Sequence, residues 1–469
     1  YVNYTYYHGP FQGCKELNLV KFEDGITSIP EYLFLDCEGI KTIEIPDTVT
    51  SISVSSFEGC TKLENVIFND NLVEIGASAF AGCDSLIKVN IPDSVTIIGN
   101  KAFQNCISLK EVELSKKLYS IGSSAFMNCA ALTFIEIPKT LKEMGTYVWY
   151  TYYHGPFQGC ESLSKAKIDD GTKNVLQYLF MDCNGLEEIE FPDSVECIEQ
   201  YAFENCTHLQ KVTFSNNLKT IDKNAFSNCT SLENVVIPMG CKTLGDSVLQ
   251  NCVSLREAYI GDSVDSIGTA IFSGCTKLER VHIPNIRQNI VDSMFYNCIS
   301  LKEINLPETL IAIRSSAFYN CDSLSEMALP KNVQIIESNA FYDCDGITKL
   351  VIPDSVTSIG NNAFNSCELL SDVSLGTGLT AISEGCFANC PSLKEIVLPY
   401  RMQTINAKAF NACTALTDVT IPRSVTTIGS QVFSYPAKMT IYGISGTYAE
   451  TYANDNSIKS VSYTHLRAH

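Results

Sequence analysis

The chain has 469 residues and a formal net charge of −19, so its overall field does not favour a nucleic acid or an anionic membrane as partner. Hydrophobic residues make up 45% of the chain, but no apolar run reaches the roughly 18 residues needed to cross a bilayer. This length would ordinarily suggest about three globular domains, but internal repeats favour one extended domain instead.

A cysteine returns every 23 residues along almost the whole chain, as from Cys60 to Cys83 to Cys106. Each of these cysteines follows a large apolar residue, usually Phe, by three positions and precedes Leu or Ile by three. One phase shift, between Cys129 and Cys160, adds eight residues. A fixed period of this length predicts a solenoid, in which each coil buries its apolar face against its neighbours.

The first part of each repeat predicts a strand. Over residues 85–106 the repeat reads SLIKVNIPDSVTIIGNKAFQNC, and its start alternates with period two. We therefore expect Val89 and Ile91 to point into the core and Lys88 and Asn90 to face water.

The rest of the repeat predicts turns. Pro92 ends the strand, because proline cannot donate to a sheet ladder. Gly99 occupies a slot in which a left-handed backbone is favoured but not required, since Glu199 fills it elsewhere. The pair Ala102 and Phe103 predicts a short helical or 3₁₀ turn on the far side of the coil.

The pattern of Leu, strand, Ile-Pro, Val, Ile-Gly, Ala-Phe and Cys is similar to the BspA-like leucine-rich repeats found in surface proteins of anaerobic bacteria and some mucosal protists. The resemblance covers residues 9–461. It implies an α/β-type solenoid that is curved and right-handed, with a parallel sheet on one face. It also implies display at the cell surface, adhesion and binding of host proteins. The family supplies no defined catalytic or ligand residues, so none is carried over.

The cysteines are expected to be buried free thiols. Eighteen of the 21 share one slot and should stack as a ladder with parallel Cα–Cβ vectors about 5 Å apart, whereas a disulfide needs Cβ atoms nearer 3.8 Å. A line of one repeated ligand also offers no tetrahedral metal cluster. Of the other three, Cys241 and Cys386 fit core substitutions, and Cys197 is expected to be partly exposed.

One coil carries an eight-residue aromatic insertion, and nearly the same string opens the chain at residues 1–14. The insertion contributes six candidate protein-binding residues, which are Tyr147, Trp149, Tyr150, Tyr152, Tyr153 and His154. Tyr and Trp are enriched at binding hot spots, so the segment is either a ligand-contacting protrusion or a cover folded over the solenoid. A Cys-His nucleophile pair with Cys160 is not favoured, because the ladder recurs without any His.

The water-facing strand positions form a second candidate surface. Glu111, Glu113 and Glu136 lie beside Phe134 in the predicted sheet, and this acidic patch could recognise a basic protein segment. The alternative is a solvated strand face of interspersed charge.

No catalytic, cofactor or metal site is predicted. The recurrent Asp after Pro, as at Asp93, could suggest a calcium stripe, but turn chemistry explains it better, since Lys139 and Arg423 take the same slot. The chain has no phosphate-binding Gly loop, HExxH, GxSxG or paired CxxC motif.

The expected organisation is a solenoid of about 19 coils over residues 1–436, a C-terminal cap over residues 437–461 and a tail over residues 462–469. The tail fits neither repeat nor cap and resembles translated adapter sequence, so it is a non-native extension in this interpretation. The chain opens at Tyr1 within a coil, so we expect further residues before it.

These features favour a non-enzymatic, cell-surface or secreted protein-binding module that adheres to host or neighbouring-cell proteins. A passive surface stalk or spacer and an intracellular protein-interaction scaffold are the alternatives. No cofactor is expected in any of the three.

Overall fold

The computed structural model describes residues 9–23, 25–145, 154–284 and 288–462. The chain divides into two compact units, residues 1–233 and 234–469, and each unit is a stack of coils with two short parallel strands per coil. The described residues form about 18 coils, against the 19 expected for the chain.

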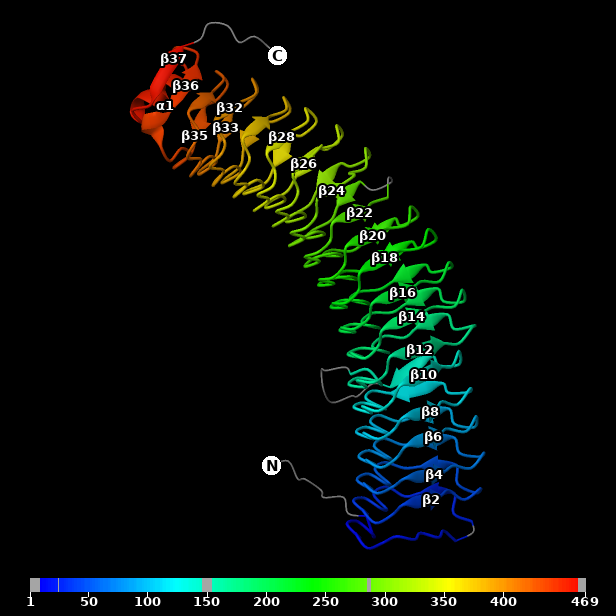
Figure 1. Ribbon diagram of the computed structural model, residues 1–469. Coiled ribbons are helices and arrows are strands. Elements are labelled where there is room, and N and C mark those ends of the chain that lie inside the picture. The colour runs from blue at the N-terminus through cyan, green and yellow to red at the C-terminus, as the bar shows by residue number, and fades with distance from the viewer. Residues whose placement is uncertain (1–8, 24, 146–153, 285–287, 463–469) are drawn as a thin grey trace. The chain divides into compact units, whose positions relative to one another are not determined.

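In the first unit, the even-numbered strands form one row of arrows (Figure 1) and the odd-numbered strands form a second row. The even-numbered strands are β2 (Thr42–Glu44), β4 (Asn65–Ile67), β6 (Lys88–Asn90), β8 (Glu111–Glu113), β10 (Phe134–Ile137), β12 (Lys165–Ile168), β14 (Glu188–Glu190) and β16 (Lys211–Thr213). The odd-numbered strands are β1 (Ser28–Ile29), β3 (Ser51–Ile52), β5 (Glu74–Ile75), β7 (Ile97–Ile98), β9 (Ser120–Gly122), β11 (Glu143–Gly145), β13 (Asn174–Val175), β15 (Cys197–Ile198) and β17 (Thr220–Ile221).

The second unit repeats this pattern. Its even-numbered strands are β18 (Asn234–Val236), β20 (Glu257–Tyr259), β22 (Arg280–His282), β24 (Glu303–Ile304), β26 (Glu326–Met327), β28 (Lys349–Val351), β30 (Asp372–Ser374), β32 (Glu395–Val397), β34 (Asp418–Thr420) and β36 (Thr440–Gly443). Its odd-numbered strands in the second row are β19 (Thr243–Leu244), β21 (Ser266–Ile267), β23 (Asn289–Ile290), β25 (Ala312–Ile313), β27 (Ile335–Ile336), β29 (Ser358–Ile359), β31 (Ala381–Ile382), β33 (Thr404–Ile405) and β35 (Thr427–Ile428). The last strand, β37 (Lys459–Ser462), instead pairs with β36 in the first row.

Strand register follows the sequence period. Lys88 pairs with Glu111 and Val89 with Val112, so partners in parallel strands are one repeat apart. The middle residue of β6 is buried and its two neighbours are exposed, as the alternation predicts. The parallel sheet of the predicted fold class is therefore confirmed.

The core consists of stacked columns of identical residues. The Phe column runs through the coils with nearly parallel rings, as between Phe57 and Phe80, whose centroids are 5.2 Å apart. Phe80 and the adjacent ladder thiol of Cys83 are both fully buried. Because nearly every coil presents the same apolar side chain to the next, with Leu249 in the Phe slot of one coil, the core is continuous within each unit.

The prediction of helical or 3₁₀ turns on the far side of each coil is wrong. Two residues per coil, four positions apart, adopt left-handed backbone, as at Lys101 (φ 59°) and Asn105 (φ 60°). A helix needs consecutive right-handed residues, so these two positions divide the segment into successive turns. The amides then alternate in direction: Gln104 N donates back to Lys101 O at 3.0 Å, whereas Phe103 N donates to Ala125 O of the next coil at 2.7 Å.

The expectation of left-handed backbone at the Gly99 slot is also wrong, because the left-handed residue lies two positions later, at Lys101. Gly99 instead permits close approach between coils. A Cβ atom added there would lie 2.5 Å from the backbone nitrogen of Ala77 in the preceding coil.

Coil stacking continues past the aromatic insertion. Phe126 and Phe157, which flank it, stack at 5.6 Å, and Phe126 N donates to Pro156 O at 2.8 Å. Strands β10 and β12 pair in register from Phe134 with Lys165 to Ile137 with Ile168. The eight added residues are therefore accommodated without a break in the core columns.

The C-terminal segment departs from the repeat. It contains the 3₁₀ helix η1 (Pro436–Lys438) and the helix α1 (Tyr448–Asp455). Helix α1 connects β36 to β37 along the chain, and these two strands pair with each other. Helix α1 buries Ala449 and Ala453, and Tyr452 meets the last core ring, Phe433, edge-on at 6.2 Å. The division into solenoid, cap and non-native tail stays a prediction.

Candidate protein-binding face

The exposed side chains of the even-numbered strands from β6 to β16 form one surface of the first unit, which we call the strand face. It has two rows, because the first and third residues of these strands point outward. Lys88, Glu111, Phe134 and Lys165 follow one another along the first row. The strand positions assigned to solvent from the sequence are therefore placed as predicted.

Phe134 is the apolar member of this charged row, and 45% of its surface is exposed. The charged residues on either side of it pair away from it. Glu111 Oε2 lies 3.1 Å from Lys88 Nζ on one side, and Lys165 Nζ lies 3.4 Å from Glu188 Oε1 on the other. The ring is thus left open to a partner.

Two grooves meet at Phe134. The larger one has a volume of about 920 Å³ and is lined by six carboxylates and two lysines, along with Phe68 and Phe134. The carboxylates are those of Asp70, Asp93, Glu111, Glu113, Glu136 and Asp169. The smaller groove, about 460 Å³, lies on the β12 to β16 side and is lined partly by Lys165, Lys167 and Lys211.

The predicted acidic residues do come together in the larger groove, but lysines share the surface with them. Lys88 contacts Glu113 at 3.4 Å as well as Glu111, and Lys167 pairs with Glu136. Such exposed pairs contribute little to stability and are screened by salt. The carboxylates outnumber the lysines even when Lys88 and Lys167 are counted.

Asp169 is a groove residue that the sequence interpretation missed. Its side chain lies beside Glu136 and 3.8 Å from Lys167 Nζ. Two causes raise the pKa of Asp169, of which burial is the larger and the neighbouring Glu136 is the smaller. Hydrogen bonding to Lys167 instead lowers the pKa of Glu136. The sequence did hold a sign that this position differs, because Asp169 occupies the repeat position that is Pro in other coils, as at Pro138.

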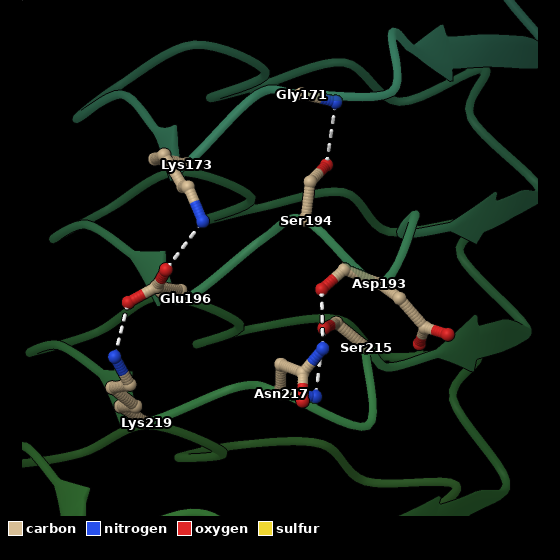
Figure 2. A network of polar contacts seen from close by, with 8 residues as sticks. All are labelled: Gly171, Lys173, Asp193, Ser194, Glu196, Ser215, Asn217 and Lys219. Atoms are coloured by element: carbon tan, nitrogen blue, oxygen red, sulfur yellow. Dashed lines mark hydrogen bonds and ion pairs between the residues drawn. The ribbon is translucent and has the colours of Figure 1, made fainter.

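A different charge arrangement lies beside the odd-numbered strands of the coils that follow the insertion, directly before β13, β15 and β17. Figure 2 shows Glu196 between Lys173 and Lys219, and Lys173 Nζ lies 2.5 Å from Glu196 Oε1. Neighbouring turns are joined by further bonds in the same view, including Gly171 N to Ser194 Oγ at 2.8 Å. Hydrogen bonds from the two lysines lower the pKa of Glu196 to about 2.

The depressed pKa of Glu196 makes a testable prediction. Because the folded pKa lies below the ordinary value of 4.5, ionised Glu196 stabilises the fold above pH 4.5, and this stabilisation is lost as pH falls toward about 2. We expect Glu196→Gln to be less stable than the parent at pH 7, with the difference disappearing across that acid window. Urea unfolding from pH 7 to pH 2 at low salt measures it, and a pH-independent difference would contradict the assignment.

Several of the Asp residues that follow Pro accept hydrogen bonds from backbone amides of the next coil. Asp93 Oδ1 accepts from Lys116 N at 2.8 Å, and Asp354 Oδ1 accepts from Thr377 N at 2.8 Å. These bonds connect successive turns, which supports the turn interpretation over a calcium stripe. Within the described ranges, no group of three or more His, Cys, Asp or Glu side chains could hold a metal ion.

The cysteine ladder contains only free thiols, and 19 of the 21 are buried. Cys241 and Cys386 are buried and Cys197 is half-buried, as predicted. Most ladder thiols also donate to a Phe carbonyl of the preceding coil, as Cys344 Sγ does to Phe318 O at 2.9 Å, while Cys275 Sγ donates to Leu249 O at 3.2 Å. The sequence identified these cysteines as small hydrophobes but not as hydrogen-bond donors.

Most of the aromatic insertion lies outside the described residues. Tyr147, Trp149, Tyr150, Tyr152 and Tyr153 all belong to that undescribed part. His154 is half-buried, and its carbonyl accepts from Ser123 Oγ at 2.9 Å.

None of the helices in the described part of the chain has the length and apolar character needed to span a bilayer. No curated protein matches the chain.

Several solved structures are similar to this chain. A leucine-rich repeat protein from Bacteroides ovatus is 24% identical, with a TM-score of 0.43 over 95% of this chain and 90% of that one. One from Eubacterium ventriosum is 23% identical, with a TM-score of 0.40 over 70% and 82%. A leucine rich cell surface protein from Faecalibacterium prausnitzii is 25% identical, with a TM-score of 0.32 over 95% and 99%.

A family model matches nearly the whole chain. It is described as "BspA type Leucine rich repeat region (6 copies)" and matches residues 7–94, 27–155, 151–279, 266–371 and 334–459. These matches coincide with the stacked coils, the Phe and Cys columns and the parallel strands described above. The chain therefore belongs to the BspA-type leucine-rich repeat family, whose solenoid is typical of a non-enzymatic protein-interaction scaffold.

Proposed function

We propose that this chain is a surface-displayed or secreted module that adheres to host or neighbouring-cell proteins, and that it binds them through the strand face around Phe134. The observation that carries the proposal is the exposed Phe134 ring at the junction of two grooves, in a row whose other members are charged. Membership of a family of surface repeats supports the extracellular setting.

The groove chemistry favours a partner segment that is basic and carries one apolar side chain. An exposed aromatic ring supplies apolar contact area at low entropic cost. Six carboxylates in the larger groove would attract Lys and Arg, and their exposure makes that attraction dependent on salt. The aromatic insertion, Tyr147 to His154, is proposed as a second contact region on the strength of its residue types.

Substitution of Phe134 tests the proposal. We expect Phe134→Ala to weaken binding by at least about tenfold, because a central aromatic anchor typically dominates binding energy. The measurement is biolayer interferometry of parent and variant against immobilised extracellular-matrix proteins, at 50 and 300 mM salt. Binding by the parent should weaken at the higher salt.

The matched control is Val351→Ala, which removes an apolar side chain of 49% exposure from the third position of β28 in the second unit. It should bind as the parent does. Equal binding by Phe134→Ala and the parent would refute the assigned face. Failure of the parent to bind any protein of the panel would favour the passive spacer.

A further inference from the structure

In the second unit, the turns that follow the core Phe residues carry a ladder of stacked aromatic rings, and this ladder ends within the unit. Tyr296, Tyr319 and Tyr342 each follow a core Phe, and their rings stack at 4.7 and 4.8 Å. In the next two coils the same slot is filled by Asn365 and Ala388. The surface therefore drops in height where the ladder ends.

A hollow of about 410 Å³ lies at this place. It exists because two small residues of one coil, Gly385 and Ala388, line it. Gly385 has left-handed backbone (φ 62°), and a Cβ atom there would lie 2.2 Å from Asn362 Oδ1. Other coils hold larger residues in the Ala388 slot, such as Gln104 and Met181.

Asparagine side chains line the hollow, and hydrogen bonds between them fix their positions. Asn365, which is buried, donates from Nδ2 to Asn362 Oδ1 at 3.0 Å. Its Oδ1 accepts from Asn389 Nδ2 at 2.9 Å and from Ser366 Oγ at 3.0 Å. Asn365 is thus held down in the floor of the hollow.

This network leaves hydrogen-bonding groups unused at the rim. Among the described residues, Asn362 Nδ2 and Asn389 Oδ1 have no partner, so one amide NH2 group and one amide oxygen remain available. The exposed amide of Asn361 adds a further donor and acceptor. Glu384 and Lys408 contribute opposite charges, so the lining carries no net charge.

We infer that this hollow, which we call the amide hollow, is a binding site for a neutral carbohydrate. Its volume falls in the range of small-ligand pockets. Sugar hydroxyls both donate and accept hydrogen bonds, which matches fixed amides that offer both. A peptide would need a pocket for an apolar anchor, and the lining offers only Gly385 and Ala388, both buried. This site is separate from the strand face and is independent of protein binding there.

The experiment titrates the full chain with neutral oligosaccharides of glucose, galactose, mannose and N-acetylglucosamine, followed by saturation-transfer NMR and calorimetry. We expect at least one series to bind the parent. Ala388→Gln should weaken that binding by about tenfold or more, because the new side chain fills the hollow and covers at least two hydrogen-bonding groups. Gln104 shows that the coil accepts glutamine in this slot.

Two further variants make the result specific. Asn389→Ala should weaken binding about two- to tenfold through loss of one hydrogen bond, and Ala412 shows that alanine is accepted in that left-handed slot. Ala81→Gln, the same substitution in the first unit, should leave sugar binding unchanged. The inference is overturned if no neutral sugar binds the parent, if Ala388→Gln binds equally well, or if the hollow binds uncharged Gly-Ser peptides and not sugars.

Discussion

Replacing Phe318 with alanine is expected to lower the free energy of unfolding of the second unit by about 3 to 5 kcal/mol. Phe318 is fully buried, and its ring stacks on Phe295 at 5.3 Å and on Phe341 at 5.1 Å. Alanine would leave a gap between two rings that belong to neighbouring coils. Because coils are stabilised mainly by their interfaces, one cavity weakens two interfaces at once.

Urea unfolding followed by circular dichroism measures this loss, with Lys349→Ala as the matched control in the same unit. Lys349 is exposed and pairs with Asp372 at 3.2 Å, and such a pair contributes at most about 1 kcal/mol. Lys88→Ala in the first unit should have a similarly small effect. Comparable losses at Phe318 and Lys349 would contradict the assignment of one to the core and the other to the surface.

The inward half of each coil could be predicted from the sequence because its physical causes are local and repeated. Alternation about Val89 sets which residues enter the core, and the 23-residue period sets which residues stack. The outward turn could not be predicted in the same way. Ala102 and Phe103 suit a helix, but neighbouring coils compete for the same backbone amides, and left-handed backbone at Lys101 and Asn105 allows those bonds to form.

In the candidate sites, too, features set by local sequence were predictable and features set by contacts between coils were not. The exposure of Glu111, Glu113 and Phe134 follows from strand alternation and was predictable. Pairing of Lys167 with Glu136 depends on the register that strands keep across the insertion, which the sequence alone does not supply. The amide hollow was missed because it arises from small side chains in one coil together with amides fixed by hydrogen bonds in the preceding coil and between the two coils.

The buried thiols predict a steep loss of stability at alkaline pH. Burial raises the pKa of Cys60 and of Cys160 to about 12, from an ordinary value of 9.0. In the unfolded chain these thiols ionise near pH 9, so the unfolded state then binds fewer protons than the folded state. The stabilisation is therefore complete below pH 9 and is lost as pH rises toward 12.

The expected loss of stability is large because burial raises the pKa of the ladder thiol in many coils. Each thiol that ionises only on unfolding lowers stability by roughly 1.4 kcal/mol per pH unit in this window. Because many of the buried thiols share this raised pKa, the melting temperature should be nearly flat from pH 6 to pH 8 and fall sharply above pH 9. Cys344→Ala and Cys367→Ala together remove two ladder thiols. In this double variant the free energy of unfolding should fall with pH less steeply than in the parent, by about 2.7 kcal/mol per pH unit.

Thiol titration in the same pH series tests the cause of the loss. At pH 7 the native chain should react at no more than two cysteines, the exposed Cys14 and the half-buried Cys197, whereas the denatured chain should titrate all 21 without reductant. Above pH 9, reactivity should appear together with unfolding, because the thiols are protected by burial and by their hydrogen bonds to Phe carbonyls. A chain that reacts at many cysteines while still folded, or that keeps its melting temperature to pH 10.5, would show that the ladder is not a buried column of protonated thiols.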